Sequence, residues 1–334
     1  MRRSLLLTSS FILSFAFVLR AQDFQYSQFY AAPLYINPAF AGLTEQHRMV
    51  VNVRDEWPTL TNAYLSGSFS YDRNIESINS GIGVIMNGEL SGTGQLWKTE
   101  IAPVYAYQFL IDEKILIRPA LKVGFNILGI NKSKLVFNDQ LESGQSSVET
   151  NIRPSRFYAD FSTGVMVLTE RYWGGLAINH LNTPNQSLID NSPESILPTK
   201  VSIHGGAKFP LPSTGGARST EKDITLAAHY KSQAKFDQLD IGGYYNHNPL
   251  VLGIWYRGLP LKSNKQGAIN ADALTFLVGV KKEGIYSLGF SYDLTISRLS
   301  FTRTAGSFEL SFIREWAVKK KKRRRQFIIP CAKF

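Results

Sequence analysis

The side chains that could carry chemistry in this 334-residue sequence are five histidines, one cysteine and a scatter of carboxylates. No histidine has the short spacing to other ligands that a zinc site requires. The single cysteine, Cys331, has no partner for an internal disulfide and cannot build a multi-cysteine metal site. We therefore predict no metal and no cofactor. The histidines are His47, His180, His204, His229 and His247.

Several carboxylates could in principle act as general acids or bases. A hydrolase also needs a positioned nucleophile, a base and a group that orients the base, and no such trio can be argued from the spacing. His180 follows Asn179 near the end of a strand-like run and is expected to be a hydrogen-bonded structural residue. We predict that the protein is not an enzyme and that its carboxylates balance cations such as Arg118 and Lys122. The carboxylates considered are Asp72, Asp160, Asp293 and Glu309.

The elements that must hold these side chains show a hydrophobic period of two. Residues 63–72, 115–127 and 286–294 each alternate apolar or aromatic residues with small, polar or charged ones. Each run has about 9–12 residues, the length that a tilted strand needs to cross a bilayer. Charges on the second face favour a membrane barrel with a wet lumen over a soluble β-sandwich. These charges are Arg54, Glu56, Lys98, Glu100, Arg118, Lys122, Asp160 and Lys208.

The pattern predicts an all-β fold, a transmembrane antiparallel β-barrel of about fourteen strands over residues 47–316. Long connections (88–96, 129–155, 182–198 and 258–271) follow odd-numbered strands and are expected to face outward, with 212–222 as the exception. An even strand count then places both termini in the periplasm. Trp57, Trp97, Trp173 and Trp316 fall near strand ends, as in an interfacial girdle. The expected strand centres are Val51, Gly67, Val84, Tyr105, Val123, Thr163, Leu176, Gly205, Ala227, Ile241, Ile254, Val278, Phe290 and Leu310.

The two ends of the chain differ in composition from the rest. Residues 1–21 begin with two arginines, continue with an apolar run and end at Ala21, which is the layout of a secretory signal peptide. Residues 317–334 hold eight cations and no acid. Without these two segments, residues 22–316 carry 26 basic and 26 acidic residues. The net charge of +11 therefore does not indicate a nucleic-acid-binding domain.

The basic tail, residues 317–334, is expected to follow the barrel in the periplasm. Seven adjacent cations repel one another and cannot pack as a strand, so the barrel should close near Trp316. The run can hold the chain end beside anionic lipid headgroups, or it can dock an acidic partner with help from the apolar residues that follow. We favour docking, with Cys331 as a free thiol or an intermolecular link. The run consists of Lys319, Lys320, Lys321, Lys322, Arg323, Arg324 and Arg325.

Between the leader and the first strand, residues 22–46 form an aromatic-rich arm. Pro33 and Pro38 remove backbone donors and disfavour helix at the residues before them, so we expect an extended conformation. So many exposed aromatic side chains need a cover, either the barrel lumen or a partner. The alternative is a linker packed on the outside of the domain.

Short motifs occur at three places in the chain: Gln22, Asp23, Ser27 and Gln28 with the run 37–42 (NPAFAG) in the arm, Asn179 and His180 in the middle, and Tyr292, Asp293 and Glu309 near the end. These motifs resemble those of the PorP/SprF family of type IX secretion system outer-membrane proteins from Bacteroidetes. The opening motif is the most specific, and the resemblance covers nearly all of the chain after the leader. In the last strands Phe290 and Phe308 stand where the family has tyrosine and histidine. The matching residues include Gln22, Asp23, Ser27, Gln28, Asn37, Pro38, Ala39, Gly42, Asn179, His180, Tyr292, Asp293 and Glu309, which we take as candidates for partner binding.

The resemblance implies a non-enzymatic outer-membrane barrel that works with the type IX machinery. It also implies that the barrel helps to secrete, or attach to the cell surface, particular cargo proteins such as gliding adhesins. The expected partners are machinery components, the C-terminal domain of a cargo protein and outer-membrane lipid. The rival hypothesis is a porin or channel for small solutes, and an outer-membrane enzyme is a distant third. An open lumen would favour the porin, whereas a lumen filled by the arm or by a partner would favour the accessory barrel.

Overall fold

A computed structural model describes residues 23–44, 47–60, 64–92, 94–111, 114–137, 140, 141, 144, 152–189, 195–212, 222–263, 269–282, 284–297 and 304–316. The predicted leader, Gln22 and the basic tail with Lys319 to Arg325 lie outside the described residues. No helix among the described residues is long and apolar enough to cross a membrane.

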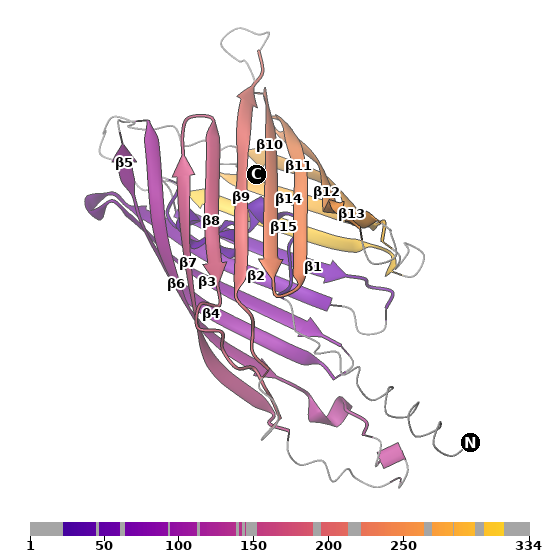
Figure 1. Cartoon of the computed structure of the whole chain (residues 1–334). Helices are drawn as coiled ribbons and strands as arrows, with labels where there is room; N and C mark the ends of the chain where they lie inside the picture. The colour runs from indigo at the N-terminus through magenta and orange to yellow at the C-terminus, as the bar shows by residue number, and fades with distance from the viewer. Residues whose placement is uncertain are drawn as a thin grey trace.

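The strands form one antiparallel sheet that closes on itself as a fourteen-stranded barrel (Figure 1). Except for β4 and β5, which do not pair with each other, each strand pairs with its neighbours in the chain, and β1 pairs with β15. Strands β4 and β5 both pair with β6, so they are two parts of one strand position, interrupted at Gln108. The strands are β1 (His47–Glu56), β2 (Tyr64–Ile75), β3 (Ser80–Ser91), β4 (Leu96–Tyr107), β5 (Phe109–Ile111), β6 (Ile115–Gly129), β7 (Ser155–Leu168), β8 (Tyr172–Asn179), β9 (Lys200–Pro210), β10 (Lys222–Gln233), β11 (Phe236–His247), β12 (Leu250–Ser263), β13 (Ile269–Lys282), β14 (Tyr286–Thr295) and β15 (Ser307–Trp316). All fourteen predicted strand centres lie within these strands, which confirms the predicted fold.

Strand β6 shows how the alternation builds the wall of the barrel. Leu121 and Phe125 point outward and are 60% and 47% exposed, whereas Arg118 and Lys122 point inward and are buried. Successive side chains of a strand point to opposite faces, so one period-two run supplies both surfaces. The apolar outer surface is the one that a bilayer would cover.

The connections divide the barrel into two ends. The connection 130–154 and the connection 180–199 lie at one end, which we call the loop end. Strand β1 starts and β15 finishes at the opposite end, which we call the terminal end. Two connections predicted to be long, 88–96 and 258–271, are mostly strand, because β3 continues to Ser91 and β12 to Ser263. The paired strands extend beyond the apolar band of the barrel. Hydrophobic alternation in the sequence does not show where the strand pairing ends.

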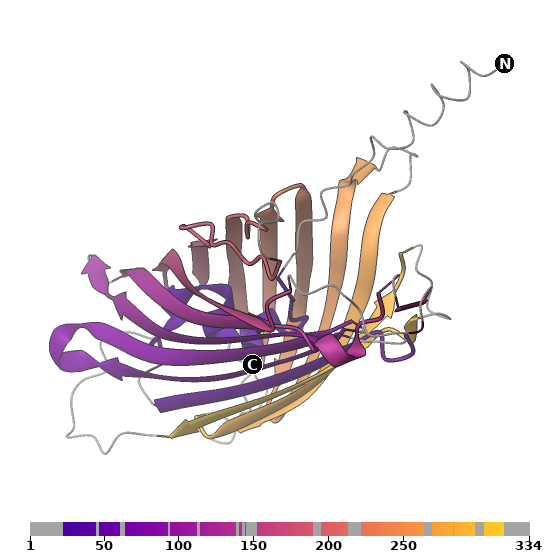
Figure 2. The same ribbon diagram turned by 90° about the horizontal axis from the view of Figure 1, so that it is seen from below.

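The largest cluster of buried apolar side chains lies inside the barrel and includes the arm, residues 23–44. The arm is the indigo segment that lies among the strands in Figures 1 and 2. Phe40, Ala39 and Ala41 have no measurable exposure, and Leu34 and Leu43 are 1% exposed. The lumen at the level of the arm is therefore a packed core, and the expectation of a wet lumen is wrong there.

Candidate functional site

The arm folds into three short helical turns, η1 (Phe29–Ala31), α2 (Pro33–Ile36) and η2 (Pro38–Phe40). The predicted extended conformation is therefore wrong. Pro33 and Pro38 each open a turn, a position where a missing N–H costs nothing and the fixed φ of proline suits the helix. The Asn37 side chain caps η2 by accepting a hydrogen bond from the Ala39 backbone N–H at 2.9 Å. The prolines thus start turns and do not keep the chain extended.

The arm runs along the barrel from the loop end to the terminal end. Asp23 contacts Lys200, the first residue of β9, and Lys98 near the start of β4, both at the loop end. The Gly42 backbone N–H donates to Asp72 at 2.7 Å near the terminal end. The arm was expected to lie with the tail at one end of the barrel. Its first described residue instead lies at the end opposite the termini of β1 and β15.

Aromatic side chains of the arm pack against rings that point inward from the barrel wall. Phe29 meets Trp255 edge to face, with ring centroids 4.8 Å apart, and Phe40 stacks on His204 at 5.4 Å. The Trp173 indole N–H donates to the Tyr30 hydroxyl at 3.3 Å. Trp173 is 5% exposed inside the barrel, so its predicted place in the outer girdle is wrong. Its parity within β8 turns the ring inward, and closeness to a strand end does not override that parity.

Glu309 of β15 holds two consecutive backbone N–H groups of the arm. Its carboxylate accepts from Ser27 N–H at 2.6 Å and from Gln28 N–H at 3.2 Å. The Gln28 side chain donates to the Glu309 carbonyl at 2.9 Å and accepts from the Ser311 hydroxyl at 2.6 Å. Gln28 has no measurable exposure, so β15 recognises the arm through both its backbone and its side chain.

Around Ser27, two arginines and two aspartates form a buried ion network. Asp293 accepts from Arg54 at 2.9 Å and from Arg257 at 3.0 Å, and Arg257 also pairs with Asp240 at 2.9 Å. The Ser27 hydroxyl donates to Asp293 at 2.5 Å and accepts from Arg257 at 2.8 Å. Buried charges need such full pairing, because an unpaired one is costly. The Ser27 hydroxyl can therefore make these hydrogen bonds only when Asp293 and Arg257 are both in place.

At the terminal end, two arginines bind the carbonyl groups that close the last turn of the arm. Arg118 donates to the Ala39 carbonyl at 3.0 Å and also to the Ala41 carbonyl. Arg48 donates to the Phe40 carbonyl at 3.0 Å and pairs with Asp72 at 2.9 Å. The prediction that Asp72 balances Arg118 or Lys122 is wrong. Arg118 is instead bound to the arm, where it satisfies carbonyl groups that a helix end leaves free.

Asn37 links the middle of the arm to the wall. Its side-chain amide donates to the Val165 carbonyl of β7 and to the Leu176 carbonyl of β8, both at 3.2 Å. A Cβ atom at Gly164 or Gly175 would collide with the Asn37 side chain. These two strand glycines therefore open the space that Asn37 occupies.

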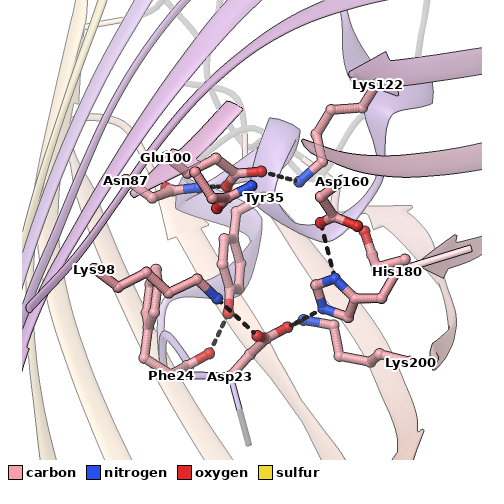
Figure 3. Close-up of a pocket in the computed structure, with 12 residues that line it drawn as sticks. Asp23, Phe24, Tyr35, Asn87, Lys98, Glu100, Lys122, Asp160, His180 and Lys200 are labelled. Carbon is pink, nitrogen blue, oxygen red and sulfur yellow. Dashed lines mark hydrogen bonds and ion pairs between the residues drawn. The ribbon is translucent and has the colours of Figure 1, made fainter. Parts of the chain in front are cut away.

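A polar pocket surrounds the start of the arm (Figure 3). Asp23 accepts from Lys200 at 2.5 Å and from His180 Nε2 at 2.8 Å, and His180 Nδ1 donates to Asp160 at 2.8 Å. Both histidine contacts are hydrogen bonds to ionised carboxylates only if both ring nitrogens carry protons. The arrangement therefore favours the imidazolium form of His180.

The pKa directions of the two groups outside the strands agree with this geometry. Burial alone would raise the pKa of Asp23, but Lys200, His180 and Lys98 together hold it well below its usual range. Burial alone would lower the pKa of His180, but Asp23 and Asp160 outweigh it and raise that pKa. Opposite charges a few ångströms apart favour the charged form of each partner. Asp23 and His180 therefore form a charged pair that fixes the start of the arm.

Lys122 and Glu100 complete the same pocket with an ion pair at 2.9 Å, and the Asn87 amide donates to Glu100 at 2.6 Å. Asn179 also lines this pocket and is buried beside His180. The prediction that Asp293 and Glu309 balance Arg118 or Lys122 is wrong, whereas Asp160 does attract Lys122 across this pocket. Asp160 pairs with His180, and the other two pair with cations of the Ser27 network.

Most of the candidate site residues described by the structure meet at the interface between the arm and the barrel wall. Tyr292 does not, because it lies on the outer face of β14, where its ring is 5.1 Å from that of Phe308. The motif residues at the interface are Asp23, Ser27, Gln28, Asn37, Pro38, Ala39, Gly42, Asn179, His180, Asp293 and Glu309.

Several residues of this interface were not among the candidates. Arg257, Asp240 and Lys200 provide charges to the arm or its network, and Trp255 provides an aromatic wall. A sequence signal for them exists, since Arg257 and Asp240 stand at inward positions within strands. Parity shows that such a residue points inward, but it does not show what the residue contacts.

Among the described residues, no group of three or more His, Cys, Asp or Glu side chains is arranged to hold a metal ion. The contacts of the interface described above are ion pairs, hydrogen bonds and packed rings.

A closed fourteen-stranded antiparallel barrel with an apolar outer surface and a packed interior defines a membrane protein of the outer-membrane barrel class. The family described as "Type IX secretion system membrane protein PorP/SprF" matches residues 18–313. The chain belongs to this family, as its motifs predicted. It is therefore a type IX secretion membrane protein with an outer-membrane barrel fold.

Solved structures that resemble this chain over most of its length have low sequence identity to it. These include the CymD monoaromatic hydrocarbon channel (12% identity, 87% of this chain, 94% of that chain, TM-score 0.43). They also include the outer membrane protein Omp33 of Acinetobacter baumannii (7% identity, 82% of this chain, 100% of that chain, TM-score 0.44). A third is the toluene transporter TodX of Pseudomonas putida (11% identity, 89% of this chain, 95% of that chain, TM-score 0.46). None of the curated proteins matches this chain.

Proposed function

We propose that the protein is a non-enzymatic accessory barrel of type IX secretion, resident in the outer membrane. In this role it assists the secretion or surface attachment of specific cargo proteins, such as gliding adhesins. The proposed partners are components of the machinery and the C-terminal domain of a cargo protein. The membership of the family supports the setting, and the filled lumen supports the accessory role.

The observation that carries the proposal is the fit between the arm and the barrel wall. A porin needs a continuous aqueous path, whereas here the arm fills the lumen with apolar and aromatic side chains. Ser27, Gln28 and Asn37 each make several buried hydrogen bonds to the wall. A segment fixed at so many points is part of the folded protein. This favours a barrel that presents surfaces to partners over a channel for solutes.

The loop end and the basic tail are the surfaces that we assign to partners. The long connections at the loop end face the cell exterior in the proposed orientation, and the tail faces the periplasm. The cation run Lys319 to Arg325 is proposed to dock an acidic component of the machinery.

Two measurements test the proposed function together. The first is purification of the tagged protein from its native membrane, with identification of whatever remains bound. The second is conductance of the purified protein in planar bilayers. Bound secretion components without stable conductance support the accessory barrel. Stable channel conductance without bound components contradicts it and assigns a porin.

A further inference from the structure

A cavity of about 700 Å³ lies at the loop end of the barrel, directly over the arm. Its floor is formed by arm residues that include Phe24, Tyr26 and Tyr35. Its walls come from the loop-end parts of the strands, among them β1, β3, β10 and β13. The volume lies within the range of sites that enclose a small molecule or a short peptide. The arm fills the barrel below the floor, so the cavity is a chamber and not part of a continuous path.

Acidic side chains outnumber basic ones on the walls of this chamber. Five carboxylates line it against two ammonium groups. Asp23 pairs with Lys200, and Glu56 lies 3.5 Å from Arg54. Within the part of the chain that the structure describes, the carboxylates of Glu89 and Asp272 take part in no salt bridge. The chamber therefore has negative charge available for a ligand, from walls on β3 and β13.

Aromatic rings supply the second property of the chamber. Trp57 and Tyr64 stand at its walls, and Tyr26 and Tyr35 at its floor. Cations bind over aromatic faces, and long cationic side chains also bury their apolar stems against such rings. The protein already shows this contact, because Lys200 Nζ lies 5.2 Å from the centre of the Tyr35 ring.

A buried polar atom on the wall also points to a ligand. His229 lines the chamber and is 6% exposed. Its Nε2 atom has no hydrogen-bond partner. Buried polar atoms in folded proteins nearly always have partners, so one without a partner beside a cavity indicates that something polar binds there.

We propose that this chamber binds a short cationic peptide segment that enters from the loop end. Lysine or arginine side chains of the segment pair with Glu89 and Asp272, and their stems lie against the aromatic rings. A rotation of the buried His229 ring would bring its unpartnered Nε2 to the segment. An extended segment of five residues spans at most about 17 Å. The proposal rests on the proposed function in one respect, namely that a partner protein reaches the loop end.

The test uses the purified full-length protein in detergent and a fluorescein-labelled peptide of alternating lysine and glycine. Anisotropy at about 0.15 M salt should show saturable binding, and the matching glutamate–glycine peptide should not bind. The double substitution Glu89→Gln with Asp272→Asn should weaken binding at least about tenfold, since hydrogen bonds to charged groups are the stronger ones. The matched control Glu315→Gln removes a carboxylate at the terminal end, outside the chamber, and should leave binding unchanged.

Several results would overturn the inference. One is equal binding of the cationic and the anionic peptide. Another is an equal loss of peptide binding in the double variant and in the control Glu315→Gln. The third is spermine that competes as strongly as the peptide, which would assign a small polyamine in place of a peptide. Ser66→Trp, which places a ring in the chamber, must also abolish binding in a barrel with unchanged unfolding temperature. Cargo secretion is scored separately, in cells with and without the protein. If removal of the protein abolishes secretion but the purified protein does not bind the peptide, this inference is refuted while the proposed function stands.

Discussion

At the scale of single residues, the inward charges serve the arm more than they serve water. Glu309 binds two backbone N–H groups of the arm, and Asp293 binds the Ser27 hydroxyl. Arg118 and Arg48 bind its carbonyl groups at the other end. Each of these charges binds a donor or an acceptor of the arm, so its substitution affects arm and wall together.

Glu309→Ala should destabilise the folded barrel by about 3–5 kcal/mol, because it leaves two arm N–H groups without their buried acceptor and removes one of the carboxylates paired with Arg54. Unfolding in detergent, followed by tryptophan fluorescence against denaturant, measures the change. Glu315→Gln, near the end of the same strand, should change stability by less than about 0.5 kcal/mol. A similar small change in both variants would show that the network does not hold the arm.

The contact between Asp23 and His180 should make the stability of the arm depend on pH. The raised pKa of His180 contributes stability that is complete below about pH 6.5, the value of unfolded histidine, and is lost as pH rises through the folded value. The lowered pKa of Asp23 contributes stability that is complete above about pH 3.9 and is lost as pH falls through the folded value. The start of the arm should therefore be most stable between about pH 4 and 6.5.

Hydrogen exchange of arm amides, corrected for the intrinsic rate at each pH, measures this dependence. His180→Gln keeps a polar side chain but cannot take up a proton, so protection should no longer fall on the alkaline side. An unchanged profile in this variant would assign the pH dependence to other groups.

At the scale of elements, the arm is a plug that belongs to the fold. Its three helical turns place aromatic side chains on one part of the wall and polar ones on another. The strands provide the complementary surface, including glycines that make room for Asn37. Removal of the arm would therefore expose a lumen lined by charged side chains that have lost their contacts with the arm.

Deletion of residues 23–40 should yield a barrel that inserts in bilayers and conducts ions, because buried charges such as Arg54 and Asp293 would then face water. Single-channel recording in planar bilayers measures the conductance. A synthetic peptide of the deleted sequence, added to the same bilayer, should reduce the current. Equal current from the deleted and the intact protein would mean that the arm does not close the barrel.

The outer face of β2 should tolerate arginine poorly at its apolar positions. Phe69 points outward in the middle of the strand, so Phe69→Arg should cost about 2–4 kcal/mol in a bilayer. Phe69→Leu is the matched control and should cost much less. Folding into lipid vesicles, followed by the mobility shift of heated and unheated samples in gels, compares the two. Equal folding of both would contradict a lipid contact at Phe69. Arginine should also be poorly tolerated at the inward Gly124, where even a Cβ would collide with Glu100.

At the scale of the whole molecule, the barrel has two unlike ends. The loop end carries the chamber and the long connections, and the terminal end carries the start of β1 and the finish of β15. The predicted orientation sets the loop end at the cell surface. The chamber would then open to the exterior, and the tail would face the periplasm.

A cysteine at Val136, which is 70% exposed in the connection 130–154, should react with a membrane-impermeant maleimide on intact cells. The background is Cys331→Ser, which removes the only native cysteine. Asn79→Cys, in a turn at the terminal end, should react only after the outer membrane is opened. The reverse pattern of labelling would invert the orientation.

The sequence alone determined the strands and the direction of their side chains. Strand geometry is local, since neighbouring side chains always point to opposite faces, so alternation in residues 115–127 already defines inward Arg118 and outward Phe125. Motifs in the arm and the last strands also identified the family. Both kinds of information reside in short stretches of the chain and need no knowledge of distant contacts.

Only the tertiary structure decided where the arm goes and what its motif residues bind. Ser27 and Glu309 are separated by 282 positions, and no local pattern indicates which of the inward carboxylates meets which backbone N–H. The turns at Pro33 and Pro38 form inside the barrel, where Arg118 binds the Ala39 carbonyl of the second turn, so the prolines alone did not reveal the conformation of the arm. The ring of Trp173 packs inside the barrel because the arm provides its partner. Such contacts depend on closure of the barrel, which brings together segments far apart in the sequence.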